Sequence, residues 1–371
     1  MQKYLITGGA GMIGSNLVRK LVDDGNVVLV VDNLWRGKLE YLIRENGEPV
    51  IDFQNQFYNR DLTIPDACDD LVQQVDYVVH LADIVAGIGY VFNNQGDLFR
   101  KNILINSHVI SSVRKATGNL KGFIYAGTAC SFPLTRQNSL DVIPLREEEL
   151  YPALPESAYG WSKLMGQYET ELLEKETGLA TCSLMFHNVY GAPCDFGERS
   201  QVIPALIRKA VRFPDEDFTV WGSGQQGRAF IHIDDIVSAI LLALNKGFGS
   251  GTIQIGPSVC TSIKEIAELI VKLSGKPITI KYDTSKPEGD KARSADYSKA
   301  KAVLGWEPRV SLEDGIKQQY QWISRQIQRE SKCFSSAPGL MPFGLKNLSG
   351  RDEHKKSLAQ DTLAVNPSGC E

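Results

Sequence analysis

The stretch KYLITGGAGMIGSNLVRKLVDDG, residues 3–25, decides the fold. KYLIT is apolar enough for a buried strand, and the apolar residues after position 12 recur with helical spacing up to Gly25, which would cap the helix. Gly8, Gly11 and Gly14 lie between the two elements. This order predicts a tight turn at Gly8, a backbone open to a ligand at Gly11, and close packing of helix on strand at Gly14.

Apolar runs and helical stretches continue to alternate up to about residue 190. The runs contain few polar residues, and near-continuous apolar strands are typical of parallel sheets that helices cover on both faces. The alternation therefore predicts a doubly wound α/β fold. The strands expected in this sheet are KYLIT (3–7), VVLVVD (27–32), YVVHLA (77–82), GFIYAG (122–127) and ATCSLMF (180–186).

The glycine pattern, placed between a strand and a helix, predicts a dinucleotide site in a Rossmann-type parallel sheet. The pyrophosphate would lie on the unpaired N–H groups of the helix N-terminus. Asp32 ends the second strand, where a carboxylate accepts both ribose hydroxyls and repels a 2′-phosphate, so NAD is expected. The nearby Arg36 is the one residue that would favour NADP instead. Asp61 is a candidate contact to the adenine. The expected cofactor-binding set is Gly8, Gly11, Met12, Ile13, Gly14, Asp32, Asn33, Asp61, Leu62, Leu81, Ala82, Tyr159 and Lys163.

Tyr159 and Lys163 in SAYGWSK have the spacing that puts two side chains on one helix face. A phenol with a pKa of about 10 is a poor base at neutral pH, but a nearby ammonium and the positive nicotinamide of oxidised NAD favour the phenolate. Lys163 would also hold the nicotinamide ribose. Thr128 ends another strand and offers its hydroxyl to the reacting substrate oxygen. The spacing alone is typical of a surface pair, but beside a glycine-rich site a catalytic role is favoured.

Composition excludes several other classes of protein. The 371-residue chain is 43% hydrophobic and 23% charged, and its net charge of −4 shows no basic footprint for nucleic acid. The seven cysteines include no CxxC pair, which speaks against a zinc site or disulfide framework and fits a reducing cytosol. No apolar run is long enough to span a membrane, and Met1 leads directly into the first strand. We expect a cytoplasmic protein without a metal, nucleic-acid or membrane partner.

The pattern changes after about residue 190, where helical segments alternate with short strands. The helical segments are expected at 203–211, 235–245, 262–274 and about 311–330. We expect residues 1–185 to form the dinucleotide-binding domain, with a later segment, about 228–260, returning to it. Residues 186–330 would mainly form a smaller C-terminal substrate-binding domain. Residues 331–371 are rich in Pro, Gly, Ser and charged side chains, and are expected to be a disordered or loosely docked tail.

Residues 1–330 resemble the extended short-chain dehydrogenase/reductase family, which includes NAD-dependent nucleotide-sugar epimerases and dehydratases. The matching motifs are TGGAGMIG, DNLWRG, HLA, YGWSK, FHNVYG, WGSGQQGRAFIHIDD and LGWEP. The resemblance implies a nucleotide-diphosphate sugar as substrate and a homodimer built on two helices per subunit. Arginine forks suit phosphate oxygens, although a single arginine is as often a solvated surface residue. The substrate-binding residues implied by the family are Asn188, Gln201, Lys209, Arg228 and Arg293.

Cys130 in GTACSFP follows the strand that carries Thr128. A free cysteine is often only a small core residue. Within the family, however, GTACSFP and FHNVYG resemble most the GDP-mannose 3,5-epimerase branch and next the GDP-L-fucose synthase branch, and both place a catalytic cysteine here. The sugar 4,6-dehydratases have an Asp-Glu pair where this chain has Ala129 and Cys130, so dehydration is disfavoured. The resemblance thus implies a GDP-sugar and a proton-moving Cys130.

The segment GERSQVIP departs from the pattern of those two branches. They place a second acid/base, Lys or His, where this chain has Gln201 or Val202, and a glutamine cannot act as a general acid. Either Glu198, His187 or a water takes the role, or the chemistry stops short of full 3,5-epimerisation.

The favoured function is an epimerase that works through a transient 4-keto sugar. Tyr159 would remove the proton of the 4-hydroxyl while a hydride passes from C4 to NAD, and Cys130 would then deprotonate C3 or C5, which the ketone acidifies. A 4-epimerase would need only Tyr159, and a C4 dehydrogenase would release NADH. A non-catalytic NAD-binding regulator is the remaining alternative, but it would have no need of Thr128, Tyr159 and Lys163 together.

Overall fold

Strand β1 (Lys3–Thr7) and helix α1 (Met12–Asp23) flank the glycine turn in the computed structural model, which describes residues 1–336. The side chains of β1 alternate between two hydrophobic cores, with Tyr4 and Ile6 in one and Leu5 in the other. The helix ends as expected, because Gly25 follows it with a φ of +81°, a backbone conformation that glycine adopts without strain.

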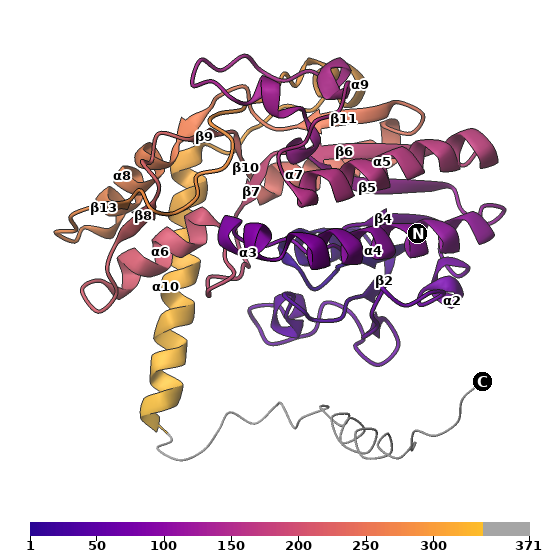
Figure 1. Ribbon diagram of the computed structural model, residues 1–371. Coiled ribbons are helices and arrows are strands. Elements are labelled where there is room, and N and C mark those ends of the chain that lie inside the picture. The colour runs from indigo at the N-terminus through magenta and orange to yellow at the C-terminus, as the bar shows by residue number, and fades with distance from the viewer. Residues whose placement is uncertain (337–371) are drawn as a thin grey trace, which may run out of the picture. The chain divides into compact units, whose positions relative to one another are not determined.

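Seven strands form one sheet in the order β11-β6-β5-β4-β1-β2-β3 (Figure 1). All of its strand pairs are parallel, which confirms the doubly wound fold. The order reverses between β1 and β4, and ligands of such sheets bind at this switch point, outside the carboxyl ends of the strands. The strands besides β1 are β2 (Val27–Val31), β3 (Phe57–Tyr58), β4 (Tyr77–His80), β5 (Gly122–Thr128), β6 (Thr181–Phe186) and β11 (Gly251–Ile255).

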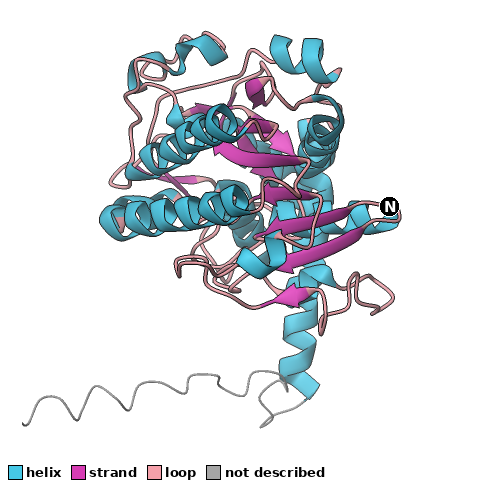
Figure 2. Cartoon of the chain, turned by 90° about the vertical axis from the view of Figure 1, so that its right-hand side faces the viewer, coloured by secondary structure: helices cyan, strands magenta, loops and turns pink. Residues whose placement is uncertain are grey.

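Helices cover both faces of the sheet, as the view along its edge shows (Figure 2). One core contains side chains of α1, α7 (Ile233–Lys246) and α9 (Ser298–Leu304). The opposite core contains side chains of α2 (Asp69–Val72), α4 (Gln95–Lys115) and α5 (Ala158–Thr177). Because both faces are buried, the strands are apolar throughout, which is why they could be recognised in the sequence.

The remaining elements lie largely beside the carboxyl ends of the strands, to the left of the sheet in Figure 1. Short strands pair there as β10 (Phe230–His232) with β7 (Asn188–Tyr190), β12 (Thr261–Ser262) with β9 (Gly227–Arg228), and β13 (Lys281–Asp283) with β8 (Thr219–Trp221). Ser262 and Glu265 form a capping box at the start of one helix, so it begins where the sequence predicted. The helices are α3 (Ile88–Asn93), α6 (Val202–Arg212), α8 (Ile263–Ser274) and α10 (Leu312–Ser336).

Residues 1–324 form one unit, and a second unit begins at Arg325. Its described part is the end of α10, which continues to Ser336 and so includes the first residues that we had assigned to the tail. The rest of the expected tail, residues 337–371, lies outside the described residues. The division at residue 185 into a cofactor and a substrate domain stays a prediction. Across residues 1–336, none of the helices has the length and hydropathy that crossing a membrane requires.

Candidate active site

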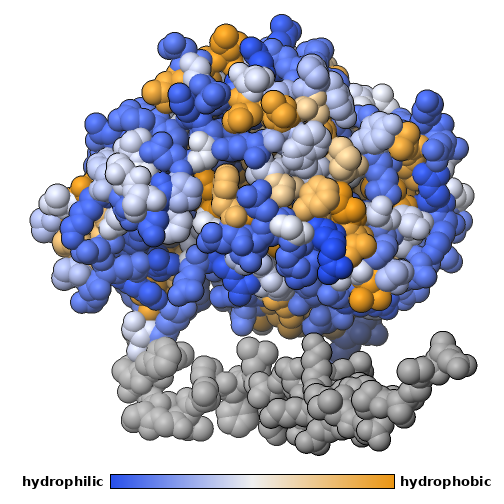
Figure 3. Space-filling view, viewed as in Figure 1, coloured by the Kyte–Doolittle hydropathy of each residue, from blue (hydrophilic) through white to orange (hydrophobic). Residues whose placement is uncertain are grey.

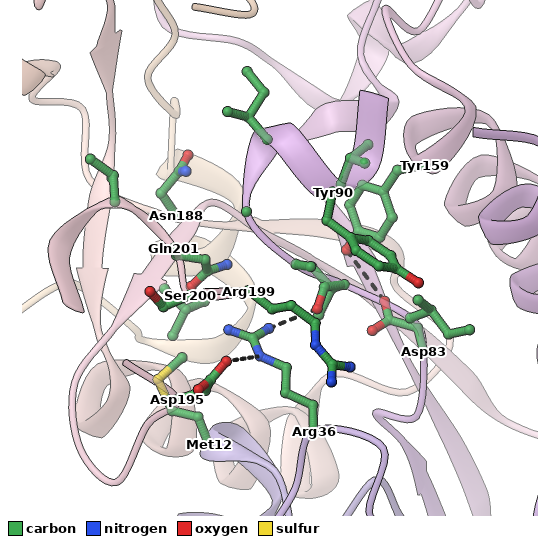
Figure 4. A pocket seen from close by; sticks show the side chains of 18 of the residues that line it. Met12, Arg36, Asp83, Tyr90, Tyr159, Asn188, Asp195, Arg199, Ser200 and Gln201 are labelled. Carbon is green, nitrogen blue, oxygen red and sulfur yellow. Dashed lines mark hydrogen bonds and ion pairs between the residues drawn. The ribbon is translucent and has the colours of Figure 1, made fainter. Parts of the chain in front are cut away.

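A cavity of about 880 Å³ opens at the carboxyl ends of the central strands. Every residue that the sequence analysis placed in the cofactor-binding, catalytic or substrate-binding set lines this cavity. Part of its wall, with residues from the glycine helix, the β4 end and the loop before α6, is drawn in Figure 4. The fold thus brings the whole set together, while the role of each residue stays a prediction.

The glycine turn forms a cradle that only glycines fit. Gly8 has a φ of +68°, and a Cβ there would lie 2.9 Å from the backbone nitrogen of Ala82. A Cβ on Gly14 would collide with the carbonyl oxygen of Gly8, so α1 begins directly against the turn. Gly11 is the N-cap of α1 and provides no side-chain cap. The helix therefore presents unpaired N–H groups to the cavity, as a pyrophosphate requires.

Asp32 lies directly after β2 with its carboxylate almost buried. Its two oxygens accept one hydrogen bond each from the backbone N–H groups of Ala10, at 3.0 Å, and Leu34, at 2.8 Å. Burial raises the pKa of Asp32, although these two bonds oppose the shift. Each oxygen retains a lone pair for a ribose hydroxyl, so the site fits the adenosine half of NAD. Arg36 is engaged elsewhere, since its guanidinium donates to the Val85 carbonyl at 2.8 Å and lies 3.9 Å from Asp195.

Tyr159 and Lys163 lie on the first turns of α5 and meet a carboxylate that the sequence analysis did not single out. Oδ2 of Asp83 accepts a hydrogen bond from the Tyr159 hydroxyl at 3.3 Å and lies 3.2 Å from Nζ of Lys163 (Figure 4). Lys163 is almost wholly buried, and its ammonium also lies over the Tyr125 ring. Burial would lower the pKa of Lys163, but Tyr125 and Asp83 outweigh it and raise the pKa.

The surroundings of Tyr159 within the protein shift its pKa. Burial, and after it the negative charge of Asp83, raise this pKa well above its ordinary value. The sequence led us to expect that Lys163 favours the phenolate, but in the structure the Lys163 charge is shared with Asp83. After burial, Asp83 is thus one of the charges that act on both the phenol and the ammonium.

Thr128 and Cys130 come from the end of β5 and the short helix after it. The Thr128 hydroxyl oxygen accepts a hydrogen bond from the backbone N–H of Cys130 at 3.3 Å, which leaves the Thr128 proton available to a substrate oxygen. A Cβ on Gly160 would collide with the carbonyl oxygen of Cys130. The glycine after Tyr159 thus lets the start of α5 pack directly against the backbone that carries the cysteine.

A buried arginine connects Cys130 to the opposite wall. Nη2 of Arg293 donates to the Cys130 sulfur at 3.2 Å, and Nη1 donates to Oδ2 of Asp290 at 2.8 Å. Burial opposes the positive charge, but Cys130 and Asp290 outweigh this effect and raise the pKa of Arg293. Arg228 donates to the Asp290 carbonyl at 2.7 Å, and burial, together with the charge of Arg293, lowers its pKa to about 10. The two cations provide positive charge next to the thiol.

The other expected substrate contacts surround this cluster. Nη2 of Arg293 lies 3.5 Å from the amide oxygen of Asn188, and Lys209 donates to the Thr219 carbonyl at 2.5 Å. Gln201 is the N-cap residue of α6 and makes no capping hydrogen bond with its side chain. Figure 4 places it, with Asn188, on the wall across the cavity from Tyr159. Burial lowers the pKa of His187 to about 3, so this ring stays neutral near pH 7 and is a poor second acid.

The sequence of residues 4–256 matches the model of the NAD dependent epimerase/dehydratase family. The chain belongs to this family. It is 31% identical to GDP-mannose 3,5-epimerase of Arabidopsis thaliana over 88% of this chain and 84% of that protein. Its fold is similar to UDP-glucose 4-epimerase of Thermotoga maritima, with a TM-score of 0.77, 29% identity, and coverage of 88% and 99% of the two chains. UDP-glucuronic acid 4-epimerase of Bacillus cereus, solved with UDP-glucuronic acid and NAD, has a TM-score of 0.71 at 27% identity, and coverage is 87% and 99%.

The protein is accordingly an NAD-dependent enzyme of the epimerase/dehydratase family that acts on nucleotide sugars. The glycine cradle and Asp32 fit this cofactor. Several acidic residues on the cavity wall were not predicted from the sequence, among them Asp83, Glu156 and Asp290. For Asp83 a signal was present, because it directly follows the strand end in HLAD, and the carboxyl ends of parallel strands meet at the ligand site.

Proposed function

We propose that this enzyme epimerises a GDP-sugar of the GDP-mannose type through a transient 4-keto sugar, with Cys130 removing a proton from C3 or C5. The observation that carries the proposal is the placement of Cys130. Its sulfur accepts a hydrogen bond from Arg293, and its backbone packs against the start of the helix that bears Tyr159 and Lys163. A thiol that faces the same cavity as a Tyr–Lys pair can act on a carbon next to the one that the pair oxidises.

Each of these residues has its own role in the proposed reaction. Tyr159 takes the proton of the sugar 4-hydroxyl, Thr128 donates a hydrogen bond to the same oxygen, and Lys163 supplies positive charge to the phenolate. The glycine cradle and Asp32 would hold NAD, which would supply reversible hydride transfer at C4. The 4-ketone makes the C3 and C5 protons acidic, because the carbanion is stabilised as an enolate. Cys130, as thiolate beside Arg293, removes one of them, and a proton delivered to the other face inverts the centre.

The comparison with one named relative supports a GDP-sugar as substrate. The Arabidopsis relative that is named GDP-mannose 3,5-epimerase is similar over 88% of this chain. Arg228, Arg293 and Lys209 line the cavity, and these cations suit the diphosphate of any nucleotide sugar. A 4-epimerase is the second candidate, because the solved structures with a similar fold include 4-epimerases of UDP-sugars. Such an enzyme needs Tyr159 but not Cys130.

The two candidates separate in a substrate and variant panel. The purified, NAD-loaded enzyme is incubated with GDP-mannose, UDP-glucose and UDP-glucuronic acid, and the products are resolved by chromatography and proton NMR. We expect epimers of GDP-mannose only, and their formation should require both Tyr159 and Cys130. Tyr159→Phe should abolish turnover and still bind NAD, whereas a regulator would keep its function. Turnover of a UDP-sugar that survives Cys130→Ser would instead identify a 4-epimerase.

We further propose that the enzyme is a cytoplasmic homodimer that pairs through α4 and α5. These helices pack against each other, and their outer side bears the exposed hydrophobic side chains of Phe99, Met165 and Tyr168. Hydrophobic patches interrupt the hydrophilic surface near the middle of this face (Figure 3). Two helices from each copy would bury the patch in a four-helix arrangement. Five cysteines are free thiols, which fits a reducing compartment: Cys68, Cys130, Cys182, Cys194 and Cys260.

A further inference from the structure

Inversion next to a ketone requires two proton-moving groups, one that removes a proton from one face of the carbon and one that delivers a proton to the other. Cys130 can be the first. The loop that precedes α6 supplies Gln201 and Val202 where a second group was expected, and an amide carries no transferable proton near pH 7. His187 is neutral because of its burial. The second group must therefore be another side chain of the cavity wall, one that holds a proton at neutral pH.

Glu156 and Asp290 form a pair of carboxyl groups on this wall. Oε2 of Glu156 accepts a hydrogen bond from the backbone N–H of Asp290 at 3.1 Å. Asp290 is almost fully buried, and its Oδ1 has no hydrogen-bond donor within residues 1–336. Burial, and after it the negative charge of Asp290, raise the pKa of Glu156. A proton held on Glu156 would relieve the repulsion and provide the missing donor for Oδ1.

A proton on Glu156 fits the charges that the proposed mechanism requires around the pair. The charged groups that face Glu156 are Asp290, Arg228 and Arg293. Cys130 belongs to the same cluster, since Arg293 donates both to its sulfur and to Asp290. The proposed mechanism uses Cys130 as a thiolate, and together with an ionised Asp290 this places two negative charges beside the two arginines. A neutral Glu156 would add no third negative charge to the cluster.

The chain segments that bear Glu156 and Cys130 both pack against Gly160. Pro155 Cβ would lie 2.9 Å from a Cβ placed on Gly160, and the Cys130 carbonyl oxygen would collide with the same atom. The segment before Glu156 therefore packs against the segment that bears the thiol. On the other side, the position of a Cβ on Gly289 is 3.3 Å from Nη2 of Arg228 and 3.7 Å from Oε2 of Glu156. The Glu156 carboxyl group and Arg228, which is expected to bind phosphate, thus lie beside the same glycine.

We propose that Glu156, supported by Asp290, is the second proton-moving group of this enzyme. The inference rests on the proposed function. Cys130 takes a proton from the carbon next to the ketone, which leaves an enolate. Glu156 then gives its proton to the opposite face of that carbon, so that a C–H bond forms and both carboxyl groups of the pair are ionised. Glu156 regains a proton from solvent and Cys130 releases one, so the cycle consumes no proton and no oxidant.

The test separates proton removal from inversion. NAD-loaded wild type, Glu156→Gln and Glu156→Asp are incubated with GDP-mannose in D2O, and NMR follows deuterium incorporation and epimer formation. Glu148→Gln serves as the matched control, since this glutamate is exposed on the surface. In Glu156→Gln we expect exchange of the C3 or C5 proton to persist, with epimer formation lowered by about 100-fold or more. Glu156→Asp, which keeps a carboxyl group, should restore part of the inversion.

A second readout does not depend on turnover. Infrared spectra near pH 7 should contain a protonated-carboxyl band that disappears in Glu156→Gln and persists in Glu148→Gln. The inference would be overturned if Glu156→Gln forms the epimer at a rate within about threefold of wild type. It would also be overturned if inversion is lost in Glu198→Gln and retained in Glu156→Gln. Thermal unfolding of each variant identifies any that fail to fold. If Glu156→Gln fails to fold, the presence or absence of the protonated-carboxyl band in the wild type decides whether the inference holds. If the wild type exchanges no carbon-bound proton of any nucleotide sugar tested, the proposed function fails and the inference fails with it.

Discussion

The Asp83→Asn variant should stay active at a lower pH than the wild type. Oδ2 of Asp83 lies 3.3 Å from the Tyr159 hydroxyl oxygen and 3.2 Å from the Lys163 nitrogen. Asparagine has the same shape and keeps an oxygen that can accept from Lys163, but it removes one negative charge. Without that charge the phenol loses a proton more readily, and the Lys163 charge is no longer shared with a carboxylate.

The size of the effect follows from the distance. At an effective dielectric constant of about 20, a unit charge about 4 Å away is worth about 4 kcal/mol. About 1.4 kcal/mol corresponds to one pH unit, so an interaction of this size corresponds to about three units. Solvent that enters the cavity screens part of this interaction, and we expect the pKa of Tyr159 to fall by about one to three units.

The assay is the pH dependence of kcat for wild type and Asp83→Asn, both loaded with NAD. The acidic limb of the profile should move to lower pH in the variant. Asp24→Asn is the control, because this carboxylate pairs with Lys20 on the surface. Tyrosinate absorbance gives the same pKa directly when Asp83→Asn is compared with the double variant that also carries Tyr159→Phe. An acidic limb that stays in place, or that moves to higher pH, would refute the role assigned to Asp83.

Three further predictions concern the cofactor cradle, the core and the outer face. Gly14→Ala should weaken NAD binding by about 100-fold or more in a fluorescence titration, because its Cβ collides with Gly8, while Gly96→Ala, whose Cβ meets no atom within 4 Å, should bind normally. His187 has a folded pKa of about 3, below its unfolded value, so the unfolded chain binds more protons in acid. This one histidine should lower the unfolding free energy by about 1.4 kcal/mol between about pH 7.5 and 5.5 in urea titrations, and His187→Asn should lose that part of the slope. Met165→Lys should convert the dimer to a monomer in sedimentation; a dimer that persists would contradict pairing through α5.

The sequence predicted those parts of the fold in which one local pattern determines the element. Strands β1, β2, β4, β5 and β6 were recognisable because both faces of the sheet are buried and the strands are apolar throughout. Strand β11 was not among them. It contains Gln254, whose side chain binds His187 and the Leu145 carbonyl, and only its pairing with β6 makes it part of the sheet. A two-residue strand such as β3 leaves no pattern at all.

The same contrast applies to the site. Tyr159 and Lys163 could be paired from the sequence, since helical spacing places them on one face. The pair of Glu156 and Asp290 could not, because the two residues are 134 positions apart and lie on loops that only the folded chain brings together. Asp83 likewise reaches Tyr159 across 76 positions. Spacing reports neighbours within an element, whereas the electrostatics of this cavity depend on neighbours between loops.

The measurement that tests the account most directly is proton exchange on GDP-mannose in D2O, followed by proton NMR and by absorbance at the NADH band. The account predicts that the C3 or C5 signal of the sugar is lost with the wild type, that it persists with Cys130→Ser, and that NADH does not accumulate. Turnover with every carbon-bound proton retained would contradict it, because Cys130 would then be only a packing residue beside Arg293. Accumulation of NADH would contradict it as well, since the reaction would end at the 4-keto sugar.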